Sequence, residues 1–250
     1  MSGGHGGAGV GTVAAFHVAS FFSEGPPHDK GLPVRAQYEH LREAFIHWCD
    51  GWHGYSPRRL RTSVLVDGTR GADYVREYSA VAGYLNYPNT GYNAIGFGAF
   101  KPFIVLHVLE RLKLGDTLLF MDCNVFKHWN LVAFPEVAAQ TTRWLIDTHG
   151  HEDVAMPREN PATKHVHICS TKALDAAEAT CNATWFSSLA QLPSPHSNRL
   201  AVRSSAASAA LMRLWLRATQ LEETYLPSPV RPGGRWHTPE QCSFGLIEYG

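Results

Sequence analysis

"GDTLLFMDCN", from Gly115 to Asn124, contains the stretch on which the fold prediction depends. Four consecutive apolar residues, Leu118 to Met121, follow Thr117 and predict a strand that is buried on both faces. The apolar run stops at Asp122, and a carboxylate is costly to withdraw from water unless a partner meets it. We therefore expect Asp122 to have a binding role at the end of this strand.

The segment before this strand predicts a helix. Pro102 suits a first helical turn, Gly115 suits a helix end, and the apolar residues between them recur at helical spacing. These apolar residues are Ile104, Val105, Val108, Leu109 and Leu112. A helix followed directly by a buried strand is typical of an α/β sheet.

Strands and helices alternate along much of the chain. Strands are expected at 12–22, 63–66, 165–170 and 198–205, and helices at 37–48, 74–85, 131–147, 171–180, 207–221 and from 238 onward. Residues 148–163 are expected to form a surface excursion. In the helix at 207–221, the residues expected to point inward are Leu211, Leu214, Trp215 and Ala218. The pattern predicts one α/β domain with a mainly parallel sheet and helices on both faces.

Composition limits the kinds of partner. Of the 250 residues, 44% are hydrophobic and 18% are charged, which is typical of a globular protein with a core. Lys plus Arg and Asp plus Glu are balanced at 22 each, so no basic field predicts binding to nucleic acid or to an anionic membrane. No apolar stretch reaches the length of a membrane span. We expect a flexible tail at 1–11 and the domain at 12–250.

The cysteines and histidines suggest a compartment but no zinc motif. The 5 cysteines are widely spaced and include no CxxC, which favours a reducing compartment and a cytoplasmic location. The 14 histidines are scattered, and no HExxH is present. His165 and His167 share one face of an expected strand, where they are either metal ligands or exposed polar residues.

Two aspartates follow expected strands of the sheet. Ligands of open α/β sheets bind at the carboxyl ends of the strands, where Asp67 and Asp122 are expected to lie. Asn124 comes two residues after Asp122, so the two side chains offer oxygen ligands to one hard cation such as Mn2+ or Mg2+. Asp67 lies in "VDGT", where an aspartate also serves as an ordinary turn residue.

The sequence "GFGAFKPFIVLHVLERLKLGDTLLFMDCN", residues 96–124, resembles the central block of small GT-A-fold glycosyltransferases. That block has a Gly-aromatic loop, a Lys-Pro helix start, and a strand that ends in an Asp-x-Asp-type metal motif. "LVDGT", "NRLAVRSSAASAALMRLWL" and "HTPEQCSFGL" are similar to further blocks of this family and occur in the expected order. Together the blocks cover about residues 64–247, which is most of the chain.

The resemblance implies a donor site. Asp122 and Asn124 would hold a divalent cation, Mn2+ or Mg2+, on the diphosphate of a nucleotide-sugar donor. Lys101 would contact the donor phosphate or sugar, at a helix start that favours anions. The alternative for Lys101 is an exposed lysine at a helix start. Asp67 would accept hydrogen bonds from the base or the ribose.

The resemblance also implies an acceptor site. Glu240 would be the catalytic base that takes the proton of the acceptor hydroxyl, and Gln241 beside it would position sugar hydroxyls. The alternative for Glu240 is an acid that stabilises the first turn of a helix. His237 would bond to a sugar, and Trp236 would stack on it or belong to the core.

The function implied is metal-dependent transfer of a sugar from a nucleoside-diphosphate sugar to a carbohydrate or other hydroxyl acceptor. The sequence departs from the family pattern at three places. The metal motif reads Asp-Cys-Asn, Glu240 stands where an aspartate is usual, and the chain ends before a later histidine ligand unless His237 serves. The alternative is a catalytically inactive relative that binds nucleotide sugars or acts as a scaffold.

Overall fold

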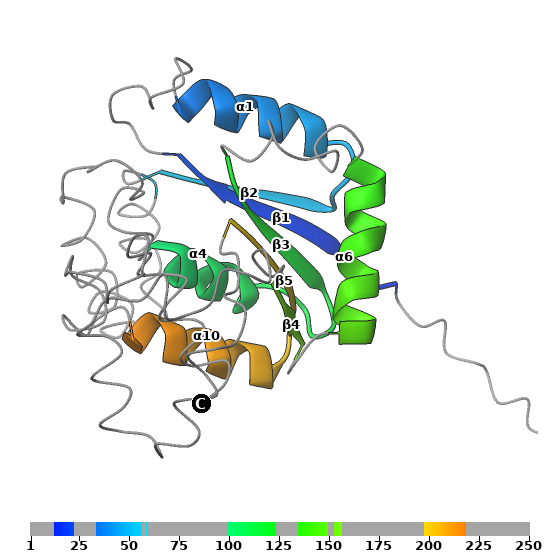
Figure 1. The fold of residues 1–250 in the computed structure, drawn as a ribbon, viewed down its shortest axis with the longest axis vertical. Coiled ribbons are helices and arrows are strands. Elements are labelled where there is room, and N and C mark those ends of the chain that lie inside the picture. Colours follow the sequence, from blue (N-terminus) through cyan, green and yellow to red (C-terminus); the bar gives the residue numbers. More distant parts are fainter. Residues whose placement is uncertain are drawn as a thin grey trace, which may run out of the picture.

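The computed structural model describes residues 13–22, 34–56, 59, 100–123, 135–149, 153–156 and 198–218. These residues form an open sheet of five strands in the order β2-β1-β3-β5-β4, with helices packed against it (Figure 1). The strands are β1 (Phe16–Phe21), β2 (Gly51–Tyr55), β3 (Thr117–Asp122), β4 (Val154–Ala155) and β5 (Arg199–Arg203). The helices are α1 (Val34–Phe45), α4 (Phe100–Leu109), α6 (Pro135–His149) and α10 (Ala206–Ala218).

The directions of the strands define a mixed sheet. β1 pairs in parallel with β2 and with β3, and Phe21 is level with both Tyr55 and Asp122. β5 pairs antiparallel with β3 and with β4. The predicted α/β class is therefore confirmed, and the parallel arrangement holds for β2, β1 and β3. Their carboxyl ends meet at one edge, which we call the carboxyl edge, while the opposite edge is the amino edge.

The sheet separates two hydrophobic cores, because β3 buries residues on both of its faces. Leu118 and Phe120 of β3 pack with α4 and α10, whereas Leu119 and Met121 pack with α1 and with Ala138 of α6. Figure 1 shows these two helix pairs apart from one another. Every residue of α4 is buried. Helices thus cover both faces, as the sequence predicted.

Several predicted elements are confirmed, with shifted ends. The strands at 12–22 and 198–205 and the strand of the opening stretch correspond to β1, β5 and β3. The predicted helices at 37–48, 131–147 and 207–221 correspond to α1, α6 and α10, and the helix that begins near Pro102 is α4. The sequence did not predict β2, and β4 lies in the expected surface excursion. The expected elements at 63–66, 74–85, 165–170, 171–180 and from 238 onward, and the tail at 1–11, lie outside the described residues.

One prediction about the face of α10 is wrong. Leu214 was expected to point inward, but it is 49% exposed. Met212 and Leu216 are buried instead, together with the expected Leu211 and Trp215. The buried stripe is therefore turned partly around the helix from the expected one, because α10 packs against α4 as well as against the sheet.

The packing of α1 on β2 depends on the absence of a side chain at Gly54. The Tyr38 hydroxyl of α1 accepts a hydrogen bond from Trp52 Nε1 of β2 at 3.0 Å. A Cβ atom at Gly54 would lie only 1.4 Å from that hydroxyl oxygen and 2.6 Å from the adjoining ring carbon. The helix thus rests on β2 where this glycine leaves room.

Gly54→Ala should lower the free energy of unfolding by about 1–3 kcal/mol, the usual cost of overpacking. The added methyl group has to displace Tyr38 and break its hydrogen bond with Trp52. Urea denaturation measures the effect. In a Tyr38→Ala background both clashing atoms are gone, so the same glycine substitution should cost much less. Equal costs in the two backgrounds would contradict this role of Tyr38.

Candidate functional site

The carboxyl edge places Asp122 beside the ends of the other parallel strands. Asp122 is the last residue of β3, and its backbone N–H donates to the carbonyl oxygen of Asn198 at 2.8 Å. Phe21, level with it on β1, stacks on Phe100 at the start of α4, with 4.0 Å between ring centroids. This stacking holds the beginning of α4 against the edge at which Asp122 emerges.

Lys101, in the first turn of α4, forms an ion pair with Asp122. Its Nζ atom lies 2.9 Å from Oδ2 of the aspartate, and the lysine side chain is only 2% exposed. A lysine is rarely buried to this degree unless a negative charge meets it. The alternative of an exposed lysine at a helix start is therefore wrong. Two predicted site residues, 21 positions apart in the sequence, lie in direct contact.

Asp122 would be a single carboxylate ligand for a divalent cation. Its side chain is 21% exposed, so an ion from solvent can reach it. Mg2+ and related ions often use one or two carboxylates and take their other ligands from water and substrate phosphates. Among the described residues, no three or more His, Cys, Asp or Glu side chains gather in a way that would hold a metal ion. Asp122 would thus share the ion with a bound diphosphate, and with Asn124 if the prediction for that residue holds.

The remaining predicted site residues cannot be compared with the geometry. The positions that lie outside the described residues are Asp67, Asn124, His165, His167, Trp236, His237, Glu240 and Gln241. Their roles stay predictions. Lys101 and Asp122 are the two members of the predicted donor site that the structure describes.

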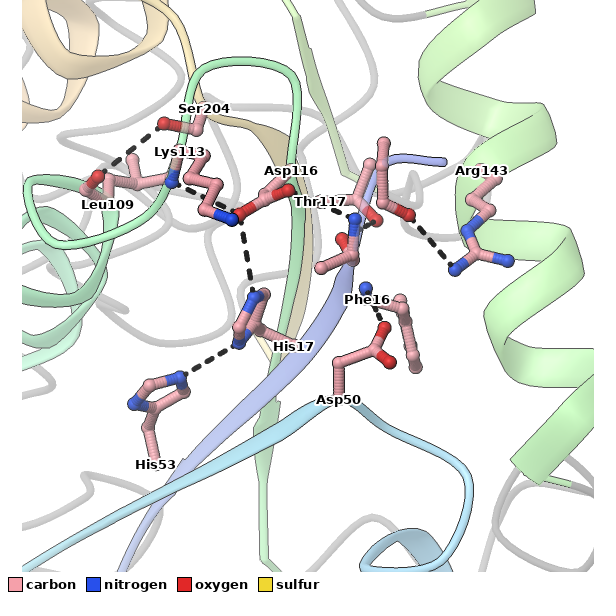
Figure 2. A network of polar contacts seen from close by, with 12 residues as sticks. Phe16, His17, Asp50, His53, Leu109, Lys113, Asp116, Thr117, Arg143 and Ser204 are labelled. Atoms are coloured by element: carbon pink, nitrogen blue, oxygen red, sulfur yellow. Dashed lines mark hydrogen bonds and ion pairs between the residues drawn. The ribbon is translucent and has the colours of Figure 1, made fainter. Parts of the chain in front are cut away.

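A row of polar side chains leads from the amino edge toward the middle of β2, and Figure 2 shows its members together. His53 Nε2 lies 3.2 Å from His17 Nδ1, and His17 Nε2 lies 3.7 Å from Oδ2 of Asp116. A Cβ atom at Gly51 would approach His17 Nδ1 to 2.4 Å, so the glycine makes room for the histidine pair. We call His53, His17 and Asp116 the histidine row.

Acidic residues at the amino edge accept hydrogen bonds from the backbone. Asp116 accepts from the N–H of Ala15 at 3.0 Å and from that of Lys113 at 3.1 Å. Asp50 accepts from the N–H of Phe16 at 2.7 Å (Figure 2). These carboxylates hold the beginnings of the parallel strands together, so the amino edge is a structural junction. The sequence analysis missed the row because β2, which carries His53, was not predicted.

Burial favours the neutral form of the two imidazoles of the histidine row, since it lowers the pKa of both. Burial lowers the pKa of His17 below its ordinary value, against the opposing effects of Asp116 and Asp50. Burial also lowers the pKa of His53 to about 4, and repulsion by Arg59 and Arg111, and by His17 and His107 when these are protonated, adds to this effect. On the neighbouring α4, His107 Nδ1 lies 2.9 Å from the hydroxyl of Tyr55, whose pKa burial raises to about 12. His17 and His53 therefore pack as neutral imidazoles at neutral pH.

The chain matches no protein-family model, no curated protein and no solved structure. Within the part of the chain that the structure describes, no helix has the length and apolar character that crossing a membrane requires. The case for a function therefore depends on the residues themselves, and first on the ion pair at the carboxyl edge.

The histidine row predicts a pH-dependent stability. Between about pH 4 and 6.5 the unfolded chain protonates His53 while the folded chain does not, so the free energy of unfolding should rise with pH across this window. His53→Gln should flatten much of that slope in urea denaturation at several pH values. His47→Gln, at an exposed position, is the matched control and should keep the wild-type slope. An unchanged slope in His53→Gln would refute the assignment.

Replacing one or the other partner of the ion pair should lower the free energy of unfolding by different amounts. Asp122→Asn should lower the free energy of unfolding by about 3 kcal/mol, because it removes the negative charge beside a buried ammonium. Lys101→Met should cost less, about 1–2 kcal/mol, since the remaining carboxylate reaches water. Urea denaturation of both variants measures the difference. If Lys101→Met lowers the free energy of unfolding by more than Asp122→Asn does, the burial of the ammonium does not determine the loss of stability.

Proposed function

We propose that this chain is a metal-dependent glycosyltransferase with a GT-A-like domain. It would move a sugar from a nucleoside-diphosphate sugar to a hydroxyl acceptor. The observation that carries the proposal is the contact between Lys101 and Asp122 at the carboxyl edge of the parallel strands. The edge is where open α/β sheets bind their ligands.

The arrangement of three segments supports this proposal. The helix start at Lys101, the end of β3 at Asp122 and the residue before β5, Asn198, all meet at this edge. They belong to two separate blocks of the sequence that resemble glycosyltransferases.

The donor half of the site follows from the charges. Asp122 and Asn124 would hold Mn2+ or Mg2+, which when bound offsets the charge of the leaving diphosphate. Lys101, at the start of α4, would contact a donor phosphate, where the helix dipole also favours an anion. Asp67 would accept hydrogen bonds from the ribose or the base.

The acceptor half would carry the proton transfer. Glu240 would take the proton of the acceptor hydroxyl as its oxygen attacks the anomeric carbon of the donor. The bond from that carbon to the diphosphate oxygen breaks, and its electron pair leaves with the diphosphate. Gln241 and His237 would position sugar hydroxyls during the attack.

The second candidate is a nucleotide-sugar-binding or scaffold protein that lacks turnover. It is favoured by the Asp-Cys-Asn motif, which supplies one carboxylate rather than two, and by the balance of that carboxylate's charge by Lys101. Release of nucleoside diphosphate from the donor discriminates between the candidates. An enzyme should release it slowly in the presence of Mn2+, and a scaffold should bind the donor without releasing it.

The test begins with nucleotide sugars screened by thermal shift with Mn2+, because a ligand at 100 times its dissociation constant adds about 2.7 kcal/mol of stability. With the donor identified, Glu240→Gln should slow transfer by about 10²–10⁴-fold and leave donor affinity almost unchanged. Gln keeps the shape of the side chain but takes no proton. Transfer within about twofold of wild type would remove Glu240 from the chemistry. Donor binding without turnover in the wild type would favour the scaffold.

A further inference from the structure

The ring nitrogens of two histidines converge on one face of the sheet. His17 Nδ1 and His53 Nε2 lie 3.2 Å apart (Figure 2). His53 on β2 is level with Ala19, which is two residues beyond His17 on β1. Side chains that are level on neighbouring strands, or two residues apart on one strand, share a face, so both histidines lie on the face where Ala19 packs with α4. We call His17 and His53 the histidine pair.

The spacing of the histidine pair suits a transition-metal ion. Zn2+ binds imidazole nitrogens at about 2.0–2.1 Å in tetrahedral geometry, so two such nitrogens on one ion lie about 3.3–3.4 Å apart. The pair already has nearly this spacing in the folded chain. An ion would take the place of the proton between the two rings, and only a small shift of either ring would be needed.

Gly51 leaves open the space that such an ion needs. A Cβ atom at this position would lie 2.4 Å from Nδ1 of His17 and 3.3 Å from Nε2 of His53, beside the same two nitrogens. The glycine therefore keeps side-chain atoms out of the point that borders both rings. The pair is also within reach of solvent, since the side chain of His17 is 14% exposed and His53 is only partly buried.

Asp116 orients the histidine pair from the other side of the His17 ring. Its Oδ2 atom lies 3.7 Å from Nε2 of His17, and backbone N–H groups of Ala15 and Lys113 hold the carboxylate in place. Histidines that bind metals usually direct their second ring nitrogen at a carboxylate, which fixes the tautomer. Asp116 favours a proton on Nε2 and thus leaves Nδ1, the nitrogen that faces His53, with a free lone pair.

The ligand types and the neighbouring charges define the class of ion. Asp50 and Asp116 act electrostatically on one ring of the pair, while Arg59 and Arg111 act on the other, so two negative and two positive neighbours offset one another. Imidazole nitrogens rather than a negative field would hold the ion, which favours Zn2+ or Cu2+ over Mg2+ or Mn2+. The described residues supply no group of three or more His, Cys, Asp or Glu side chains for a metal, so water would fill the other positions.

We propose that the histidine pair binds a Zn2+ or Cu2+ ion, which bridges β1 and β2. The proton of the shared hydrogen bond moves to Nδ1 of His53, so that both facing nitrogens present lone pairs to the ion. β2 contains two glycines and no continuous apolar run, and the bridge adds to the contacts that hold it against β1. This inference does not rest on the proposed function, whose cation lies at the carboxyl edge and belongs to a harder class.

Cu2+ locates the site in the wild-type chain, because this paramagnetic ion broadens the nuclear magnetic resonance signals of nearby groups. With up to one equivalent of Cu2+, the backbone amide signals around His17 and His53 should disappear first. Those around Phe21 and Asp122, at the carboxyl edge, should persist. Loss of signals elsewhere in the chain while those of the histidine pair remain would overturn the site.

Variants test the two ligands and the space beside them by isothermal titration calorimetry with Cu2+. His53→Gln should weaken binding at least about tenfold, because one of two nitrogen ligands is gone. Gly51→Ala keeps both ligands but fills the space beside them, so it should also weaken binding. His47→Gln, at an exposed position, is the matched control and should keep the wild-type affinity. Circular dichroism establishes that each variant is folded.

Zn2+ should raise the Tm of the wild type and of His47→Gln, but not that of His53→Gln, since an ion that binds only the folded chain stabilises it. Equal Cu2+ affinity in the wild type and in folded His53→Gln overturns the site and leaves the pair as a structural hydrogen bond. Displacement of Cu2+ by excess Mg2+ overturns the class of ion. If His53→Gln does not fold, the broadening pattern of the wild type decides.

Discussion

The strand β3 has no face left for water, and much of the fold follows from this constraint. Its side chains enter two cores in alternation, so helices must cover both faces of the sheet. Its backbone must find hydrogen-bond partners on both sides, which β1 supplies in parallel and β5 supplies antiparallel. Thr117, at its first position, is still buried, so among its residues the burial stops only at Asp122.

The aspartates at the two edges of the sheet meet different kinds of partner. Asp50 and Asp116, at the amino edge, accept from backbone N–H groups that the fold holds in place. Asp122, at the carboxyl edge, is held by a side-chain ammonium. A backbone donor cannot leave its acceptor without local unfolding. The carboxylates of the amino edge are therefore fixed by the backbone, whereas Asp122 is paired with the buried side chain of Lys101.

A strand or helix could be predicted from the sequence where its own residues carry the pattern that defines it. β3 and β5 carry continuous apolar runs, β1 is mostly apolar, and α4 carries a Pro-bearing start, so the sequence alone predicted them. β2 has the sequence "GWHGY". Its place in the sheet depends on Tyr38 and His17, which pack in the space that its two glycines leave. β4 has two residues and exists through its pairing with β5. Such elements are defined by distant partners that a window of sequence does not contain.

The same reasoning applies to the candidate site. The apolar run identified Asp122, because the charge that ends a buried strand needs a partner, but nothing local identified that partner. The burial of Lys101 was not predicted, since a lysine at a helix start is ordinarily exposed. The fold supplies the missing relation: α4 runs back across the sheet before β3 begins, so the start of the helix and the end of the strand meet.

An ion pair in this position stabilises the empty site and also limits which ligands the site would bind. The favourable contact between Lys101 and Asp122 has to be given up before either group binds anything else. A ligand that pairs with only one of the two charges leaves the other charge unpaired, which costs free energy. The net free energy of binding such a ligand is therefore small. A ligand that brings both a cation and an anion replaces both halves of the contact at once. In the proposed function, the pair would therefore favour a ligand that carries both charges, as a metal-bound diphosphate does.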